Sequence, residues 1–339
     1  MRNSPSVNIY FYIPKSFWPI QIPASSNENW SGFGVGIYAW TLQTYLKLKE
    51  AGVGCQLIDR LPEEGIVLFH ANAIRGTTIQ PGPKRLLICL KAEAPLCAQA
   101  QLHVVQNPCE VSKWLGCHFI PHWPQPGLQP RSPGRQGRFE TVAFLGHRNS
   151  LAAELMTPEW EQQLQQRNLN WLPVINTNAW SKHQSIDTRW NDYRQIDVIV
   201  AVRQFNRRQP GYRSKPATKL YNAWLAGVPA ILGRELAYQT EGRAGVDYME
   251  ANSMAELWSC LDRLQQDSVL RAKIVKRGQL RSLHYTPEML VKRWQQFLHN
   301  VAIPAYQTWV NGSSWQRQVS YGGGTFFNYC DRTIRRLTN

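Results

Sequence analysis

Short apolar runs alternate with amphipathic stretches along the whole chain. In the first half, Tyr38, Leu42 and Tyr45 recur at helical spacing, and the predicted helix ends near Gly52. Runs rich in β-branched and aromatic residues predict strands at Val7 to Ile13, Gln56 to Asp59, Ile66 to His70, Leu86 to Leu90 and Leu102 to Gln106. Strands that alternate with helices predict a parallel, doubly wound sheet.

The second half repeats this alternation. An amphipathic helix is predicted at Lys215 to Ala226, and further helices begin at the capping box of Ser253 and at Thr286. The predicted strands span Thr141 to Gly146, Asn170 to Ile175, Asp197 to Val202 and Val228 to Leu232. The pattern therefore predicts an α/β protein with two Rossmann-like domains that face each other across a cleft. Ligands bind such sheets beyond the carboxyl ends of the strands.

A segment rich in proline and glycine separates the two halves. Pro124 to Arg138 contains four prolines and three glycines, so it cannot form a regular element. It is predicted to be an interdomain linker, with one long surface loop as the alternative. The predicted division is an N-terminal domain at 1–123, the linker at 124–138, a C-terminal domain at 139–305 and an extension at 306–339.

The composition points to anionic partners and a reducing compartment. Lys and Arg number 38 against 23 Asp and Glu, a formal charge of +15, which favours phosphorylated substrates, nucleic acid or an acidic membrane surface without choosing among them. The seven cysteines are odd in number and show no CxxC pair, so neither a disulfide framework nor a metal site is predicted. No secretory signal or spanning segment is found. The predicted location is cytoplasmic, free or peripheral on the inner face of a membrane.

The clearest candidate chemistry lies on the helix predicted at Lys215 to Ala226. Lys215, Lys219 and Asn222 share one face of this helix. Lysines at a helix start oppose the helix dipole, so together with the free N–H groups of the helix tip they predict an anion site. A solvated basic face is the alternative. Arg203 ends a predicted strand and is a second candidate for phosphate, with simple solvation as its alternative.

Two features of the first half are candidates on the acceptor side. His70 closes a predicted strand and would face the cleft, where it is predicted to act as a catalytic base; a structural role is the alternative. Gly32, Gly34 and Gly36 form a GxGxG run before a helix. They come too late after the first strand for a tight dinucleotide fingerprint.

The run KPATKLYNAWLAGVPAILGRELAY, from Lys215 to Tyr238, and GVDYMEANSMAELWSCLDRL, from Gly245 to Leu264, resemble the donor-binding half of GT-B glycosyltransferases. The likeness is to the group of sucrose-synthase-like and lipopolysaccharide enzymes. It covers the second half of the chain well and the first half only in pattern. The resemblance implies a glycosyltransferase that moves a sugar from a nucleotide-diphosphate sugar to an acceptor. It also implies retention of anomeric configuration. No metal is expected, because side chains meet the phosphate charge and no carboxylate cluster is visible, and no cofactor is expected, since the nucleotide sugar is a substrate.

The resemblance also implies roles for single residues. The two glutamates usual in the family fall on Ser214 and Asn222, so neither carboxylate is present, although Asn222 can still bond a ribose hydroxyl. Glu235 is a nearby carboxylate for the donor, with a surface acid at a helix start as the alternative. The implied donor site consists of Arg148, Arg203, Lys215 and Lys219 at the diphosphate, Asn222 and Tyr238 at the ribose and base, Glu235, and Gly34 and Gly36 of the glycine-rich loop.

Two other functions remain open. The positive charge and the 14 tryptophans fit a protein that binds nucleic acid or another polyanion, but no recognition motif is evident and nucleic acid is not expected as a partner. The missing carboxylates fit an inactive glycosyltransferase relative that retains ligand binding. The sugar, the nucleotide base and the class of acceptor, whether glycan, lipid or small molecule, are left open.

Overall fold

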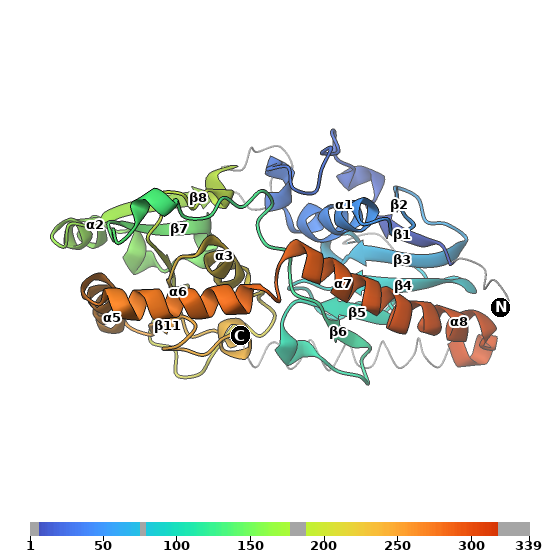
Figure 1. Ribbon diagram of the computed structural model, residues 1–339. Helices are drawn as coiled ribbons and strands as arrows, with labels where there is room; N and C mark the ends of the chain where they lie inside the picture. Colours follow the sequence, from blue (N-terminus) through green and yellow to red (C-terminus); the bar gives the residue numbers. More distant parts are fainter. Residues whose placement is uncertain (1–6, 75–78, 177–187, 318–339) are drawn as a thin grey trace.

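The structure, a computed structural model, describes residues 7–74, 79–176 and 188–317. Its strands form two wholly parallel sheets (Figure 1). The first contains β1 (Ile9–Tyr12), β2 (Cys55–Ile58), β3 (Glu64–His70), β4 (Lys84–Leu90), β5 (Leu102–Val105) and β6 (Cys117–Phe119). The second contains β7 (Thr141–His147), β8 (Asn170–Asn176), β9 (Val198–Ala201), β10 (Ala230–Leu232) and β11 (Met249–Glu250).

The strand orders are β2-β1-β3-β4-β5-β6 and β11-β10-β9-β7-β8. Each order changes direction within its sheet, as in a doubly wound fold. The predicted α/β fold with two Rossmann-like halves is therefore confirmed. The apolar runs named from the sequence all form strands, whereas β6 and β11, with three and two residues, were not predicted. Such short edge strands carry too few residues for a hydrophobic pattern to show.

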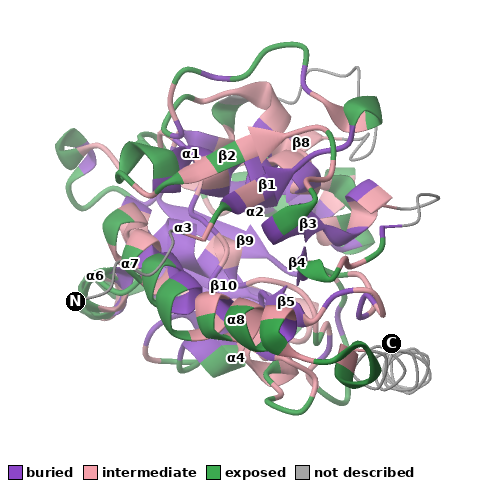
Figure 2. Ribbon diagram, turned by 90° about the vertical axis from the view of Figure 1, so that its right-hand side faces the viewer, coloured by how far each residue is buried: buried purple, intermediate pink, exposed green. Residues whose placement is uncertain are grey.

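Helices cover both sheets and leave most of the strands buried, whereas the edge strands β2 and β8 are only partly buried (Figure 2). Two predicted N-caps are present: Ser253 accepts a hydrogen bond from the Glu256 N–H at 3.1 Å, and Thr286 accepts one from the Met289 N–H at 3.4 Å. The helices are α1 (Gln43–Glu50), α2 (Pro158–Gln165), α3 (Thr218–Ala226), α4 (Leu236–Glu241), α5 (Met254–Gln266), α6 (Ser268–Ser282), α7 (Pro287–Phe297) and α8 (Ile303–Asn311). The sequence pattern did not predict α4, α6 or α8.

The last helices return to the first sheet. Leu290, Trp294 and Phe297 of α7 and Trp309 of α8 are buried in the same hydrophobic cluster as the strands β1, β3 and β4. The chain therefore crosses between the halves twice, once through residues 124–138 and once between α6 and α7 (Figure 1). The domain ranges remain a prediction. Helix α7 lies within the range predicted for the C-terminal domain, but it packs against the first sheet.

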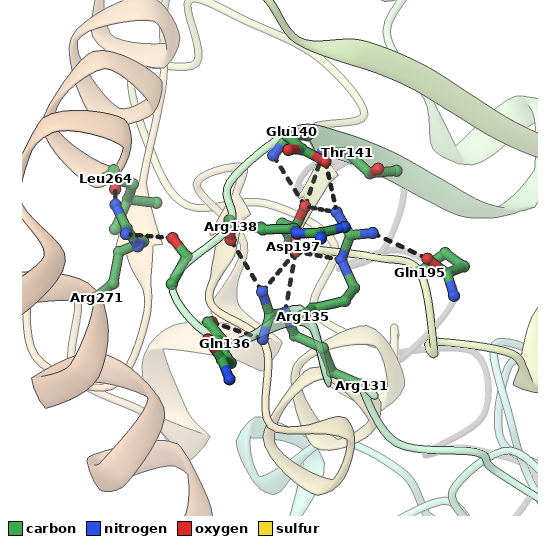
Figure 3. A network of polar contacts seen from close by, with 11 residues as sticks. Arg131, Arg135, Gln136, Arg138, Glu140, Thr141, Gln195, Asp197, Leu264 and Arg271 are labelled. Atoms are coloured by element: carbon green, nitrogen blue, oxygen red, sulfur yellow. Dashed lines mark hydrogen bonds and ion pairs between the residues drawn. The ribbon is translucent and has the colours of Figure 1, made fainter. Parts of the chain in front are cut away.

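The segment between the sheets is fixed to the second half by two arginines (Figure 3). Arg131 and Arg135 both donate hydrogen bonds to Asp197, which is 2% exposed and directly precedes β9. The N–H groups of Glu140 and Thr141, at the start of β7, donate to the same carboxylate at 2.9 and 3.0 Å. Burial alone would raise the pKa of Asp197, but these hydrogen bonds hold it below its usual range. This network lies at the amino-terminal edge of the second sheet.

Candidate functional site

A cavity of about 310 Å³ lies between the two halves of the molecule. Its walls include Glu93, which follows β4, His147, which ends β7, and Arg203, which follows β9. The cavity therefore opens at the carboxyl ends of strands from both sheets, where parallel α/β folds bind ligands. Of the residues predicted from the sequence, the lining includes Gly34, Gly36, Arg203, Lys215, Lys219, Asn222 and Tyr238.

The amino-terminal end of α3 points its first turn at this cavity. Ala217, the residue that precedes the helix, provides no side-chain cap, so the first N–H groups of α3 have no intrahelical acceptor. Lys219 lies in that turn, with its Nζ 5.1 Å from the centre of the Phe144 ring. A β-carbon at Gly146 would stand only 2.8 Å from this Nζ, so the glycine makes room for the ammonium group. An uncapped helix tip with a lysine is suited to an anion.

The surroundings of Lys219 disfavour its positively charged form. Burial, and then the positive charges of Arg203 and Lys215, lower its pKa to about 7, against the opposing effect of Glu235 and Glu93. Lys219 forms no ion pair with any residue in the described part of the chain. A bound anion would supply the missing negative charge.

Lys215 reaches across the cleft to the first half. Its ammonium group forms an ion pair with Glu93. The backbone before α3 is held from the same side, because Gln106 Nε2 donates to the Ser214 carbonyl at 2.9 Å and Asn107 Nδ2 to the Lys215 carbonyl at 3.1 Å. The helix begins at Thr218, so Lys215 lies in this held segment and not in the first turn as predicted.

Arg203 forms a buried ion pair with Glu235. Its Nε lies 3.1 Å from Glu235 Oε1, and its guanidinium also donates to the Ser150 hydroxyl. Glu235 is 1% exposed, so the alternative of a surface acid is wrong. It does not line the cavity and instead holds Arg203, which does. Burial raises the pKa of the neighbouring Tyr238, which therefore lines the site as a neutral phenol.

The sequence foresaw neither the hydrogen bond that Asn222 makes nor the place of His147 at the cavity. The Oδ1 atom of Asn222 accepts a hydrogen bond from the Gln125 N–H at 3.0 Å, so this amide fastens the segment between the sheets to α3. His147 lines the cavity and meets Trp190 edge to face at 4.8 Å. Burial, followed by the nearby Lys219 charge, lowers the His147 pKa to about 4, so the imidazole is neutral. Its place at the end of a predicted strand is the signal that could have identified it.

Besides Glu235, two further predicted residues do not line the cavity. Arg148 follows β7 in a short turn and is exposed to solvent. His70 is buried behind Gly36, where its Nε2 would lie 3.4 Å from a β-carbon at that glycine, and its Nδ1 accepts a hydrogen bond from the Asn72 N–H at 3.0 Å. The donor role of Arg148 and the catalytic role of His70 stay predictions.

Within 7–74, 79–176 and 188–317, no three His, Cys, Asp or Glu side chains are grouped so that they could hold a metal ion. No helix in these ranges combines the length and the apolar character needed to cross a membrane.

The chain is similar to solved glycosyltransferases in its fold. No protein-family model and no curated protein matches the sequence. HepE of Anabaena, solved with UDP and with UDP-glucose, is 10% identical, with a TM-score of 0.49 over 87% of this chain and 100% of that chain. AviGT4, a glycosyltransferase involved in avilamycin A biosynthesis, is 12% identical, with a TM-score of 0.49 over 91% and 99%. Sucrose-phosphate synthase of Thermosynechococcus elongatus is 14% identical, with a TM-score of 0.48 over 70% and 74%.

These structures match most of the chain at low sequence identity. At such identities the likeness is one of fold.

Proposed function

We propose that this protein transfers a sugar from a nucleotide-diphosphate sugar to an acceptor. The observation that carries the proposal is the cluster of Lys215, Lys219 and Arg203 around the uncapped tip of α3, inside a cavity between two parallel sheets. A diphosphate needs several positive groups and N–H donors at close range. The motifs from Lys215 to Leu264 that resemble the donor half of GT-B enzymes support the same assignment.

The residues divide the work between binding and leaving-group stabilisation. The diphosphate lies against the α3 tip, with Lys219 and Lys215 on its oxygens, and Arg203 is held in place by Glu235. As the bond between the anomeric carbon and the diphosphate oxygen breaks, negative charge grows on the leaving group, and these fixed positive groups stabilise it. Asn222 and Tyr238 lie on the nucleoside side, and the acceptor enters past Gly34. Retention of anomeric configuration and independence from metal are part of the proposal.

Binding must also rearrange one contact in the cleft. Glu93 holds the Lys215 ammonium group from the opposite wall. A diphosphate placed on Lys215 repels that carboxylate, so Glu93 has to turn toward solvent, which its 48% exposed side chain can do. The donor therefore replaces an internal counter-ion instead of filling a neutral pocket.

The second candidate is a ligand-binding relative without turnover. Ser214 and Asn222 stand where the family carries glutamates, and the Asn222 Oδ1 atom already accepts a hydrogen bond from Gln125. This arrangement leaves the diphosphate site intact and removes carboxylates expected at the donor.

A nucleotide-sugar titration separates the candidates. UDP-glucose and GDP-mannose are added to the full chain, and the melting temperature and the release of free nucleotide diphosphate are measured, with and without a panel of acceptors. A saturable rise in melting temperature with turnover is expected. Stabilisation without turnover would favour the inactive relative. Salt-sensitive binding of nucleic acid alone would favour a polyanion-binding protein, and no response to any nucleotide would end the proposal.

A matched pair of variants locates the binding. Lys219→Ala should abolish most of the stabilisation by nucleotide, whereas Lys84→Ala, which removes the same charge at a side chain 68% exposed, should leave it unchanged. Equal responses of the two variants would mean that the nucleotide binds through net charge and not in the cavity.

A further inference from the structure

One face of α6 combines aliphatic side chains with lysines. Val269, Leu280 and Leu283 are 61%, 51% and 61% exposed, which is far from the usual burial of such residues. Successive helical residues are turned by about 100°, so positions 269, 273, 276, 280 and 283 fall on one line along the helix. We call this line the α6 stripe; its residues are Val269, Lys273, Lys276, Leu280 and Leu283.

The opposite face of α6 packs against α3 and attaches the helix to the core. Ile274 and Gly278 are buried there, and a β-carbon at Gly278 would stand 2.5 Å from the Trp224 ring of α3. The α6 stripe therefore makes no contribution to the core and points away from it. Isolated exposed aliphatic residues are ordinary. A helix face that only contacts water is expected to be polar, whereas this one carries three aliphatic residues in line with two lysines.

The charge along the segment that carries the α6 stripe is mainly positive. Between residues 267 and 293 the sequence has seven Lys or Arg residues and two acidic residues, Asp267 and Glu288. Arg277 and Arg281 form ion pairs with Asp247 at 3.5 and 3.1 Å. Lys273 and Lys276 form no ion pair with another residue in the ranges that the structure describes. Their charges are thus available to an external anionic surface.

The shape of the α6 stripe favours a bilayer over a protein partner. Its aliphatic residues are spread over about 21 Å of helix and contain no aromatic anchor of the kind that fills a pocket in a protein interface. Lysines between them can extend to lipid phosphates while the aliphatic groups enter the acyl boundary. In addition, α7 and α8 follow α6 along the same side of the molecule, which gives a long flank (Figure 1).

We propose that the α6 stripe docks this protein on an anionic bilayer surface. Lys273 and Lys276 bind lipid phosphates, and Val269, Leu280 and Leu283 enter the headgroup region. This inference concerns the outer surface and does not depend on the proposed sugar transfer, because no residue of the stripe lines the cavity.

Vesicle sedimentation of the full chain tests the proposal. Binding to vesicles of phosphatidylcholine mixed with phosphatidylglycerol is compared with binding to phosphatidylcholine alone, at low and high salt. The wild type should bind the anionic vesicles and lose this binding at high salt. Lys273→Gln with Lys276→Gln should weaken binding about fivefold for each lysine. Leu280→Ser with Leu283→Ser should weaken it by about tenfold or more, even at low salt.

Matched controls separate the stripe from the general charge of the chain. Lys15→Gln with Lys84→Gln removes the same charge elsewhere, and Ile20→Ser with Val111→Ser removes exposed aliphatic groups elsewhere. Both controls should bind like the wild type. Equal losses in stripe and control variants, or no preference for anionic vesicles, would overturn the proposal. So would a dimer in solution that Leu280→Ser with Leu283→Ser dissociates while vesicle binding is absent.

Discussion

The two edges of the second sheet both gather positive side chains, but they differ in how these charges are paired. At the amino-terminal edge both arginines have acidic partners, whereas at the carboxyl edge Arg203 and Lys215 are paired and Lys219 is in no ion pair with a described residue. At the amino-terminal edge, Arg131 and Arg135 meet Asp197, whose carboxylate accepts hydrogen bonds from both and from two backbone N–H groups (Figure 3). At the carboxyl edge, Lys219 lies beside Arg203 with no ion-pair partner of its own among the residues that the structure describes. The protein supplies the anion at one edge and leaves room for it at the other.

This difference distinguishes a structural cluster from a binding cluster. A neutralised group of charges stabilises the fold because breaking it leaves buried charge without a partner. A group with surplus charge destabilises the empty protein slightly and is relieved by a ligand. The overall charge of the chain carries no such information, since arginine and lysine contribute to it in the same way at both edges.

The largest effect is expected at Asp197. Asp197→Asn keeps the size of the side chain but leaves Arg131 without a counter-charge and Arg135 with only the half-exposed Glu140, so the free energy of unfolding should fall by about 3 kcal/mol. Urea unfolding measures this change. Asp192→Asn, which breaks the exposed pair with Arg194, is the control and should cost less than about 1 kcal/mol. A similar loss in both variants would mean that the network is no more than a surface ion pair.

At the opposite edge, Lys219→Ala should act on binding instead of stability. Affinity for UDP-glucose should fall about 100-fold, because a charged hydrogen bond to phosphate is lost. Stability should stay the same or rise, since the variant removes a desolvated cation that Arg203 and Lys215 repel. Calorimetric titration and urea unfolding measure the two quantities. A large loss of stability with unchanged affinity would assign Lys219 to the fold.

Gly146→Ala should produce a smaller version of the same binding defect. The new methyl group would stand 2.8 Å from Lys219 Nζ and 3.0 Å from the Phe144 ring, so the ammonium group must move. Affinity for UDP-glucose should fall about tenfold, with a stability cost of about 1 kcal/mol. Gly54→Ala, where a β-carbon meets no atom within 4 Å, is the control. An unaffected Gly146→Ala variant would show that Lys219 has no fixed place in the site.

The sequence predicts residues that share one element, but it does not predict contacts between distant elements. Helical spacing placed Lys215, Lys219 and Asn222 on one face, and all three line the cavity, although Lys215 reaches it from the segment before α3 and not from the helix. Periodicity acts within one element, so it cannot pair Glu235 with Arg203 across 32 positions, nor show that Gln125 binds Asn222. The strand pattern also could not show which residue after β7 faces the cleft: His147 lines the cavity, whereas Arg148 lies in the turn that follows and is exposed.

The smallest expected effect is on pH dependence: nucleotide affinity at the carboxyl edge and stability at the amino-terminal edge should respond to pH in different ranges. Lys219 has a pKa of about 7 in the empty site, and a bound diphosphate raises that pKa, so binding takes up a proton above neutral pH. Affinity for UDP-glucose should therefore fall about fivefold between about pH 7 and 8, as the free protein loses the Lys219 proton. The Asp197 network behaves in the opposite sense: its lowered pKa gives stability that is full at neutral pH and is lost only in acid, below the ordinary pKa of an aspartate.

Calorimetry in two buffers of different ionisation enthalpy measures the proton uptake by Lys219, which should vanish in Lys219→Ala. Uptake that persists in this variant would assign the titration to another group, and an affinity that is constant over this range would mean that Lys219 is already fully charged in the empty cleft.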